Sequence, residues 1–161
     1  MVYLTDKERD ALISEPKPLP NNFRDLLRAS PKANYNHEEG QLHIQTEAGN
    51  RYRIVLRRSL TNVLDFSVIL LYFHKATGEW IPIIRYNGKH SEHTNKIEGQ
   101  RFYDFHIHKI TERYQEVGLK PVGYAEVCTK FSDYRGALAQ FLRDLNFQEP
   151  SSDQMDLFRR F

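Results

Sequence analysis

The stretch between Arg85 and Gly118 holds four of the seven histidines in the chain, namely His90, His93, His106 and His108. Histidine titrates near neutral pH, so it can take up a proton at one step of a reaction and release one at another. Cleavage of RNA through its 2′-hydroxyl needs such an acid and base, together with a cation that offsets charge on the phosphorus oxygens. The stretch therefore predicts an acid–base site built from these histidines, with Arg85 as the anion clamp.

The spacing of these residues predicts how they meet. Asp104, His106 and His108 alternate along a predicted strand at 102–108, and alternate residues of a strand share one face. We expect Asp104 to orient an imidazole or to tune its proton affinity. We expect the polar segment 89–100 to be a loop that folds His90 or His93 over the same face. The predicted mechanism uses no metal and no cofactor.

Two other roles are open for the histidines. His106 and His108 lie on one side of the predicted strand, as ligands do in several metal sites, and His90 or His93 would complete a metal centre with them. Alternatively, the histidines only satisfy backbone or carboxylate partners in a sheet that is rich in aromatic residues. The runner-up function is then a non-enzymatic binding or inhibitor module of a defence, toxin–antitoxin or phage system.

Arginines form a second pattern, because Arg51, Arg53 and Arg57 fall on one face of a predicted strand at 51–57. A strand places such residues at intervals of about 6–7 Å, a spacing that suits successive phosphates of a nucleic acid. We therefore predict that these arginines, with Lys89, bind an RNA substrate. The other interpretation is a solvated outer face without a specific ligand.

The order of the elements predicts an α+β fold, with an antiparallel meander of about five strands, short N-terminal helices, and C-terminal helices packed on one face of the sheet. Alternation of apolar and polar residues, or a continuous apolar run, marks the strands. Capping residues and helical periodicity mark the helices. The expected helices span 6–14, 23–29, 109–117 and 134–145, and the expected strands span 42–45, 51–57, 66–74, 80–86 and 102–108.

Details of three segments complete this prediction. In the strand at 80–86, Ile81, Ile83 and Arg85 are expected to share a face, and Pro82 indicates an edge or a bulge. The polar segment 30–40 is expected to be a loop. In the predicted helix at 109–117, Val117 is expected to point inward and Gly118 to end the helix.

The totals indicate one ordinary globular domain at 1–149 of the 161-residue chain, followed by a tail at 150–161. We expect the apolar residues of this tail to dock on this chain or on a protein partner, and exposed aromatic strands allow a homodimer. A net charge of +2 is too small to indicate a polyanion partner by itself. The single cysteine, Cys128, allows no disulfide within the chain, and we expect a cytoplasmic protein without a signal peptide or a membrane-spanning segment.

The segments RYNG, HTN, FYDFHIH and TERYQ, between Ile84 and Gln115, resemble small uncharacterised prokaryotic proteins that share this histidine pattern. The same region is distantly similar to compact RNA-targeting toxins of toxin–antitoxin pairs. The resemblance covers about a fifth of the chain and carries over no catalytic residue. It implies a bacterial or phage setting in which the chain is an RNA-acting enzyme of the toxin or defence type.

Overall fold

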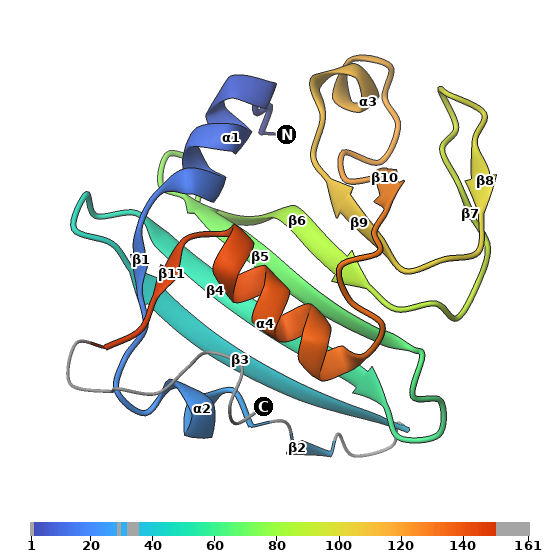
Figure 1. Ribbon diagram of the computed structural model, residues 1–161. Coiled ribbons are helices and arrows are strands. Elements are labelled where there is room, and N and C mark those ends of the chain that lie inside the picture. Colours follow the sequence, from blue (N-terminus) through green and yellow to red (C-terminus); the bar gives the residue numbers. More distant parts are fainter. Residues whose placement is uncertain (1, 29, 32–35, 151–161) are drawn as a thin grey trace.

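A computed structural model describes residues 2–28, 30–31 and 36–150 (Figure 1). Its largest element is an antiparallel sheet of seven strands in the order β10-β9-β6-β5-β4-β3-β2. The strands span Ser30–Pro31 (β2), His37–Gln45 (β3), Arg51–Ser59 (β4), Phe66–His74 (β5), Glu79–Asn87 (β6), His106–Lys109 (β9) and Tyr124–Val127 (β10). The predicted α+β class, with its antiparallel meander, is confirmed.

The helices lie mainly against one face of this sheet, as α4 (Tyr134–Asp144) shows most clearly in Figure 1. Buried side chains of α4, such as Phe141 and Leu142, belong to the same core as buried sheet residues such as Ile54 and Leu70. The first helix, α1 (Asp6–Ser14), and the short α2 (Phe23–Leu26) contribute to the same core. We call this side of the sheet the inner face and the opposite side the outer face.

Local sequence signals set the helix ends as expected. The hydroxyl of Thr5 accepts a hydrogen bond from the amide of Glu8 at the start of α1, and the carboxylate of Asp133 accepts one from the amide of Gly136 at the start of α4. The helix α3 (Glu112–Glu116) is shorter than expected, and Val117 beyond it is exposed rather than inward. Gly118 follows with a positive φ, as the expected helix stop requires.

A bulge in β6 decides which way Arg85 points. Leu70 of β5 pairs with Ile84, but Leu71 pairs with Pro82, so the residue between them is the extra one. The bulge that Pro82 indicated is therefore present. Because it inverts the alternation, Ile81 lies on the inner face and Arg85 on the outer face, and the expectation that they share a face was wrong.

The region between β6 and β9 also differs from the expectation. The segment at 89–100 is not all loop, because β7 (His93–Thr94) pairs with β8 (Arg101–Phe102) in a separate hairpin. The predicted strand at 102–108 is consequently broken between β8 and β9. Similarly, β3 begins at His37 inside the segment that was expected to be loop, where Glu38 forms an ion pair with Arg58 of the neighbouring strand. The predicted docking tail lies almost wholly outside the described residues.

A buried lysine joins the two ends of the described chain. Lys17 lies in β1 (Lys17–Pro18), which pairs in parallel with β11 (Phe147–Gln148). Its ammonium group is fully buried and donates hydrogen bonds to the carbonyl oxygens of Ile13, Glu15 and Leu145 at 2.8–2.9 Å. Burial lowers the pKa of Lys17 from 10.5 to about 8, and the Glu15 carboxylate acts in the opposite direction.

This pKa makes the stability of the protein depend on pH in a defined direction. Between pH 8 and pH 10.5 the unfolded chain holds the Lys17 proton more tightly than the folded chain, so deprotonation favours the folded state as the pH rises. We expect the free energy of unfolding of the wild type to rise relative to Lys17→Met by about 2–3 kcal/mol across this window. Urea unfolding of both proteins at several pH values measures the difference in free energy of unfolding. Groups that titrate in both proteins contribute equally and cancel in this difference. A constant difference would contradict the prediction.

Candidate active site

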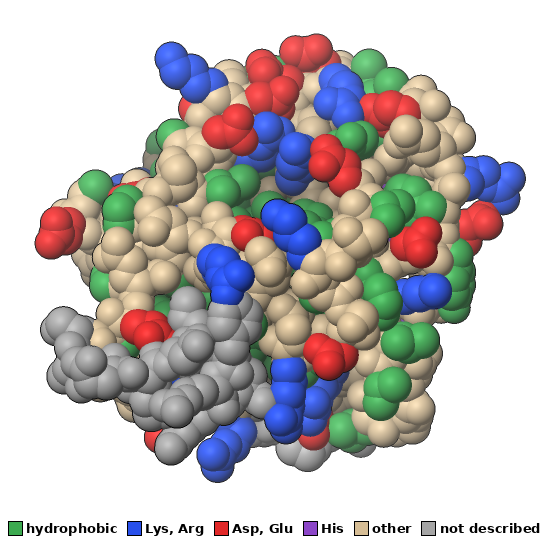
Figure 2. Space-filling view, in the orientation of Figure 1, with side chains coloured by type: hydrophobic (Ala, Val, Ile, Leu, Met, Phe, Trp, Pro, Cys, Tyr) green, Lys and Arg blue, Asp and Glu red, His purple; other side chains and the backbone are tan. Residues whose placement is uncertain are grey.

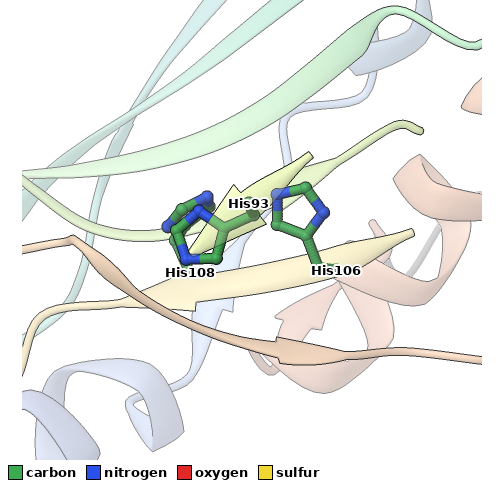
Figure 3. Close-up of side chains that lie close together, drawn as sticks. All are labelled: His93, His106 and His108. Carbon is green, nitrogen blue, oxygen red and sulfur yellow. The ribbon is translucent and has the colours of Figure 1, made fainter. Parts of the chain in front are cut away.

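Three histidine rings meet above the outer face, at the edge where the β7–β8 hairpin folds back over β9 (Figure 3). His106 and His108 alternate along β9, so they share a face, and His93 reaches them from β7. The ring centroid of His93 is 5.5 Å from that of His106 and 4.7 Å from that of His108. The ring centroids of His106 and His108 are 4.9 Å apart. One ring nitrogen of each residue lies within 4.8 Å of those of the other two.

Burial keeps two of the rings neutral. His106 is 5% exposed and His108 is 9% exposed. Burial lowers the pKa of His108 to about 3, helped by the nearby charges of His106, Arg85 and His93. Burial also lowers the pKa of His106, and the charges of His93, His90 and Arg85 act in the same direction. Both imidazoles therefore carry one proton near neutral pH, the form that can bind a metal ion.

Main-chain carbonyls determine which nitrogen carries that proton. Nδ1 of His106 is 2.7 Å from the carbonyl oxygen of Asp104, and Nδ1 of His108 is 2.8 Å from that of Val122. A carbonyl oxygen only accepts, so each Nδ1 donates and the proton is located there. The lone pair of each ring is then at Nε2, away from the carbonyl.

The side chain of Asn95 determines which ring nitrogen of His93 carries the proton. The side-chain amide of Asn95 donates to the carbonyl oxygen of Ala125 at 2.8 Å, and its oxygen accepts from the amide of Ala125 at 2.9 Å. These two backbone bonds fix the orientation of the amide, so its oxygen must also be the acceptor at 2.8 Å from Nε2 of His93. The lone pair of His93 is therefore at Nδ1. Asn95 is fully buried, so this arrangement is shielded from water.

The cluster lies between two cavities of different character. One, of about 220 Å³, is polar and contains all three histidines together with Arg57, Asp65, Ser67, Arg85, Asn87, His90, Ser91 and Glu92. The other, of about 350 Å³, is mainly apolar and touches His93 and His108 from the side of Tyr114 and Leu119. The polar cavity thus gives access to all three rings, and the apolar cavity gives access to His93 and His108.

Two arginines dominate the charge of the polar cavity. Arg57 and Arg85 have no side-chain hydrogen bond or ion pair with any part of the chain that the structure describes, and the pKa of Arg85 is lowered by burial and by the charge of Arg57. The two acids of the cavity already have basic partners. Asp65 lies 3.4 Å from His90 and 3.7 Å from His37, and Glu92 pairs with Arg101 at 2.8 Å. The cavity therefore favours an anion beside the histidines.

The structure brings together most, but not all, of the residues predicted for the site. His90, His93, His106, His108, Arg85 and Arg57 line the polar cavity. Asp104 is exposed, and it contacts His106 through its main-chain oxygen, whereas the prediction used its carboxylate. Lys89 lies 5.9 Å from the ring of Tyr103 and does not line the cavity, because the chain turns away after β6.

Arg51 and Arg53 also lie outside the cavity, farther along β4, where their guanidinium groups stack on Phe73 and Trp80. Sequence reasoning missed Asn95, which is the centre of the hydrogen bonds that hold His93. The signal was present in the spacing of His93 and Asn95, two residues apart in an otherwise polar segment. A side chain that is polar and yet fully buried could not be distinguished there from a solvated one without the fold.

In the described part of the chain, no helix has the length and apolar character needed to cross a membrane. Comparisons with family models, with curated proteins and with solved structures found no match for this chain.

Proposed function

We propose that the chain is a metal-dependent hydrolase that acts on phosphodiesters, with His93, His106 and His108 as the ligands of one divalent metal ion. The observation that carries this proposal is the convergence of three imidazoles, each of which has one ring nitrogen held by an oxygen acceptor. Such outer hydrogen bonds accompany metal-binding histidines in proteins, because they fix the tautomer and strengthen the ligand. An ordinary group of surface histidines has no reason to share this arrangement.

The donor set favours zinc. Neutral imidazoles suit Zn²⁺ among the common metals, and three histidines with an open fourth position form a known type of catalytic zinc site. Zinc–nitrogen bonds of about 2.0–2.1 Å at tetrahedral angles separate the nitrogens by about 3.4 Å. Nitrogens that lie within 4.8 Å of one another would therefore have to move closer together to hold one ion.

The reaction follows from the two components of the cavity. Arg57 and Arg85 hold the non-bridging oxygens of the phosphate, since a planar guanidinium matches two such oxygens at once. A metal ion held by His93, His106 and His108 would supply Lewis-acid chemistry and a water that is deprotonated near pH 7. In the hydrolysis that this arrangement would support, a water oxygen bonds to phosphorus, the bond from phosphorus to the leaving oxygen breaks, and that oxygen takes a proton from solvent. One water is consumed, and a phosphomonoester and an alcohol are released.

A second candidate is the metal-independent RNA-acting enzyme of the toxin or defence type, in which the histidines act as acid and base. The observation that favours it is the pair of His90 and Asp65 at the cavity, in which the side chain of His90 is more exposed than that of His106. Arg57 and Arg85 serve the phosphate in this candidate as well. Cleavage of RNA that persists in excess chelator would favour it over the metal-dependent enzyme. For either candidate, the single free cysteine supports assignment to the cytoplasm.

Metal content tests the main proposal directly. We expect the wild-type protein, loaded with zinc and passed through a desalting column, to retain about one metal ion per chain. His93→Ala removes one ligand from the hairpin and should retain little metal. His74→Ala is the matched control, because His74 lies at the end of β5, outside both cavities, and contacts Thr77.

The measurement is elemental analysis, with isothermal titration calorimetry for the affinity and circular dichroism to establish that each variant is folded. The proposal fails if the wild type retains no metal, or if His93→Ala retains as much as His74→Ala.

A further inference from the structure

The pairing of the strands brings the outer-face residues into rows that run across the sheet to the histidines. Directly paired residues share a face. One row runs through Glu39, Arg57, Ser67, Asn87 and His106, and the next through Gln41, Val55, Ile69, Arg85 and His108. Farther along the strands, His43 pairs with Arg53, and Phe73 pairs with Trp80. We call the outer face of β3 to β6 in these rows, together with Arg51, which pairs with Gln45, the arginine face.

The arginine face is strongly cationic, although the chain as a whole is nearly neutral. Its rows contain Arg51, Arg53, Arg57 and Arg85, with Glu39 as their acid, whereas the chain has 23 basic and 21 acidic residues. None of the four arginines has a side-chain hydrogen bond or ion pair to any of the residues described. By contrast, Figure 2 shows positive and negative side chains interspersed over the α4 side.

The same face carries flat and apolar groups that are only partly covered. Arg51 lies 4.5 Å from the ring centroid of Phe73, and Arg53 lies 4.7 Å from that of Trp80. The ring of His43, on an exposed position of β3, meets the edge of Trp80 at 5.7 Å. Val55, Ile69 and Leu71 lie between them, half-exposed and outside the core. Arginines that stack on aromatic rings keep a planar surface and N–H donors for a ligand.

From these observations we infer that the arginine face binds a single-stranded nucleic acid and delivers it to the histidine cavity. Phosphates pair with arginines, and unpaired bases stack on guanidinium, aromatic and aliphatic surfaces, as on other strand-binding platforms. In a duplex the bases are stacked on one another and are not accessible to this face, so only the phosphate contacts remain. A second copy of this chain fits poorly, since the same face on both copies would set arginine against arginine.

The path of the strand follows from the shared rows. Arg57 and Arg85 belong both to the arginine face and to the wall of the polar cavity, in register with His106 and His108. A strand that occupies the face therefore places a phosphodiester next to the three rings. Hydrolysis of that phosphodiester rests on the proposed function, whereas binding of the strand does not.

The experiment measures binding without chemistry. Apoprotein in chelator is titrated into fluorescein-labelled oligouridylate of roughly 12 nucleotides, its deoxythymidylate analogue and a duplex of the same length, and the anisotropy is recorded. We expect both single strands to bind more tightly than the duplex. With four arginines engaged, the logarithm of the affinity should fall with the logarithm of the salt concentration with a slope of about −3.

Substitutions locate the surface. Arg53→Ala and Arg51→Ala should each weaken binding of the single strand about tenfold and reduce the salt slope by about 0.7, because each removes a stacking and a phosphate contact. The matched control is Arg135→Ala, an exposed arginine in α4 on the inner-face side. It should leave both quantities unchanged.

Four results would overturn the inference. The first is an affinity for the duplex that equals the affinity for the single strands. The second is a loss of binding in Arg57→Ala but not in Arg51→Ala or Arg53→Ala, and the third is a loss in Arg135→Ala as large as in those two variants. The fourth is a dimer, detected by sedimentation, that Arg53→Ala dissociates. Metal retention is measured separately, on zinc-loaded and desalted samples of the same proteins without chelator. Metal without strand binding refutes the arginine face and leaves the metal centre, whereas strand binding without metal refutes the metal centre and leaves the face.

Discussion

Replacement of His108 by alanine is expected to lower the rate of phosphodiester hydrolysis by on the order of 10³-fold or more. Loss of one of three ligands removes the metal, which stabilises the developing charge by several kcal/mol, and about 1.4 kcal/mol corresponds to each factor of ten. The measurement is the release of 4-nitrophenolate from bis(4-nitrophenyl) phosphate, which reports hydrolysis without strand binding. Zinc-loaded wild type, His108→Ala and His74→Ala are compared.

The controls separate chemistry from folding. His108 donates to the carbonyl of Val122, so its removal leaves a buried acceptor without a donor and costs about 1–3 kcal/mol of stability. Far-ultraviolet circular dichroism and urea unfolding show whether the variant is folded under assay conditions. Chelator provides a second route that leaves the chain unchanged, since it should abolish the wild-type rate and added zinc should restore it. A wild-type rate that survives chelator while His108→Ala is inactive would contradict the metal role and support acid–base catalysis.

Replacement of Asn95 by alanine is expected to have the largest effect among residues that do not touch the metal. Its side chain joins His93 on the hairpin to both backbone groups of Ala125 on β10, and it also donates to Gln100. Removing a fully buried group of this kind leaves several polar atoms unsatisfied, so the free energy of unfolding should fall by about 3 kcal/mol. Zinc affinity should fall by about 10–100-fold, because His93 loses the acceptor that fixes its tautomer.

Asn95→Asp distinguishes positioning of the metal ligand from a structural role alone. The aspartate keeps the acceptor for His93 and for the amide of Ala125 but loses the two donated hydrogen bonds. We expect this variant to be destabilised in urea unfolding and yet to bind zinc more tightly than Asn95→Ala in calorimetry. Equal zinc affinities for the two variants would mean that Asn95 acts only on the fold.

Much of the fold could be predicted, since local rules apply to it. The caps at Thr5 and Asp133 placed both long helices, because they satisfy amides within one turn of the helix. The continuous apolar run at Phe66–His74 predicted a central strand, and β5 pairs on both sides. The errors were at the hairpin β7–β8 and the start of β3, where polar residues form strands whose partners are distant or exposed.

The candidate site was predicted in part for the same reason. Alternation along one strand was enough to place His106 and His108 on a common face, and it also aligned Arg53 with Arg57 on β4. Alternation failed at Arg85, because the bulge beside Pro82 inverts the side from that point on. Alternation also predicted that the carboxylate of Asp104 contacts a histidine. Because the backbone bends between β8 and β9, the main-chain carbonyl of Asp104 contacts His106 instead.

By itself, then, the sequence determined the α+β class, the two long helices, the shared face of His106 and His108, and the concentration of histidines before Gly118. These follow from the periods of strand and helix, which act over a few residues. Only the tertiary structure decided that His93 joins the pair while His90 turns to Asp65, that Asn95 is buried, and that Arg57 and Arg85 face the same cavity. Those contacts depend on how a hairpin folds across a sheet and on the register of strands far apart in the chain, which no local pattern specifies.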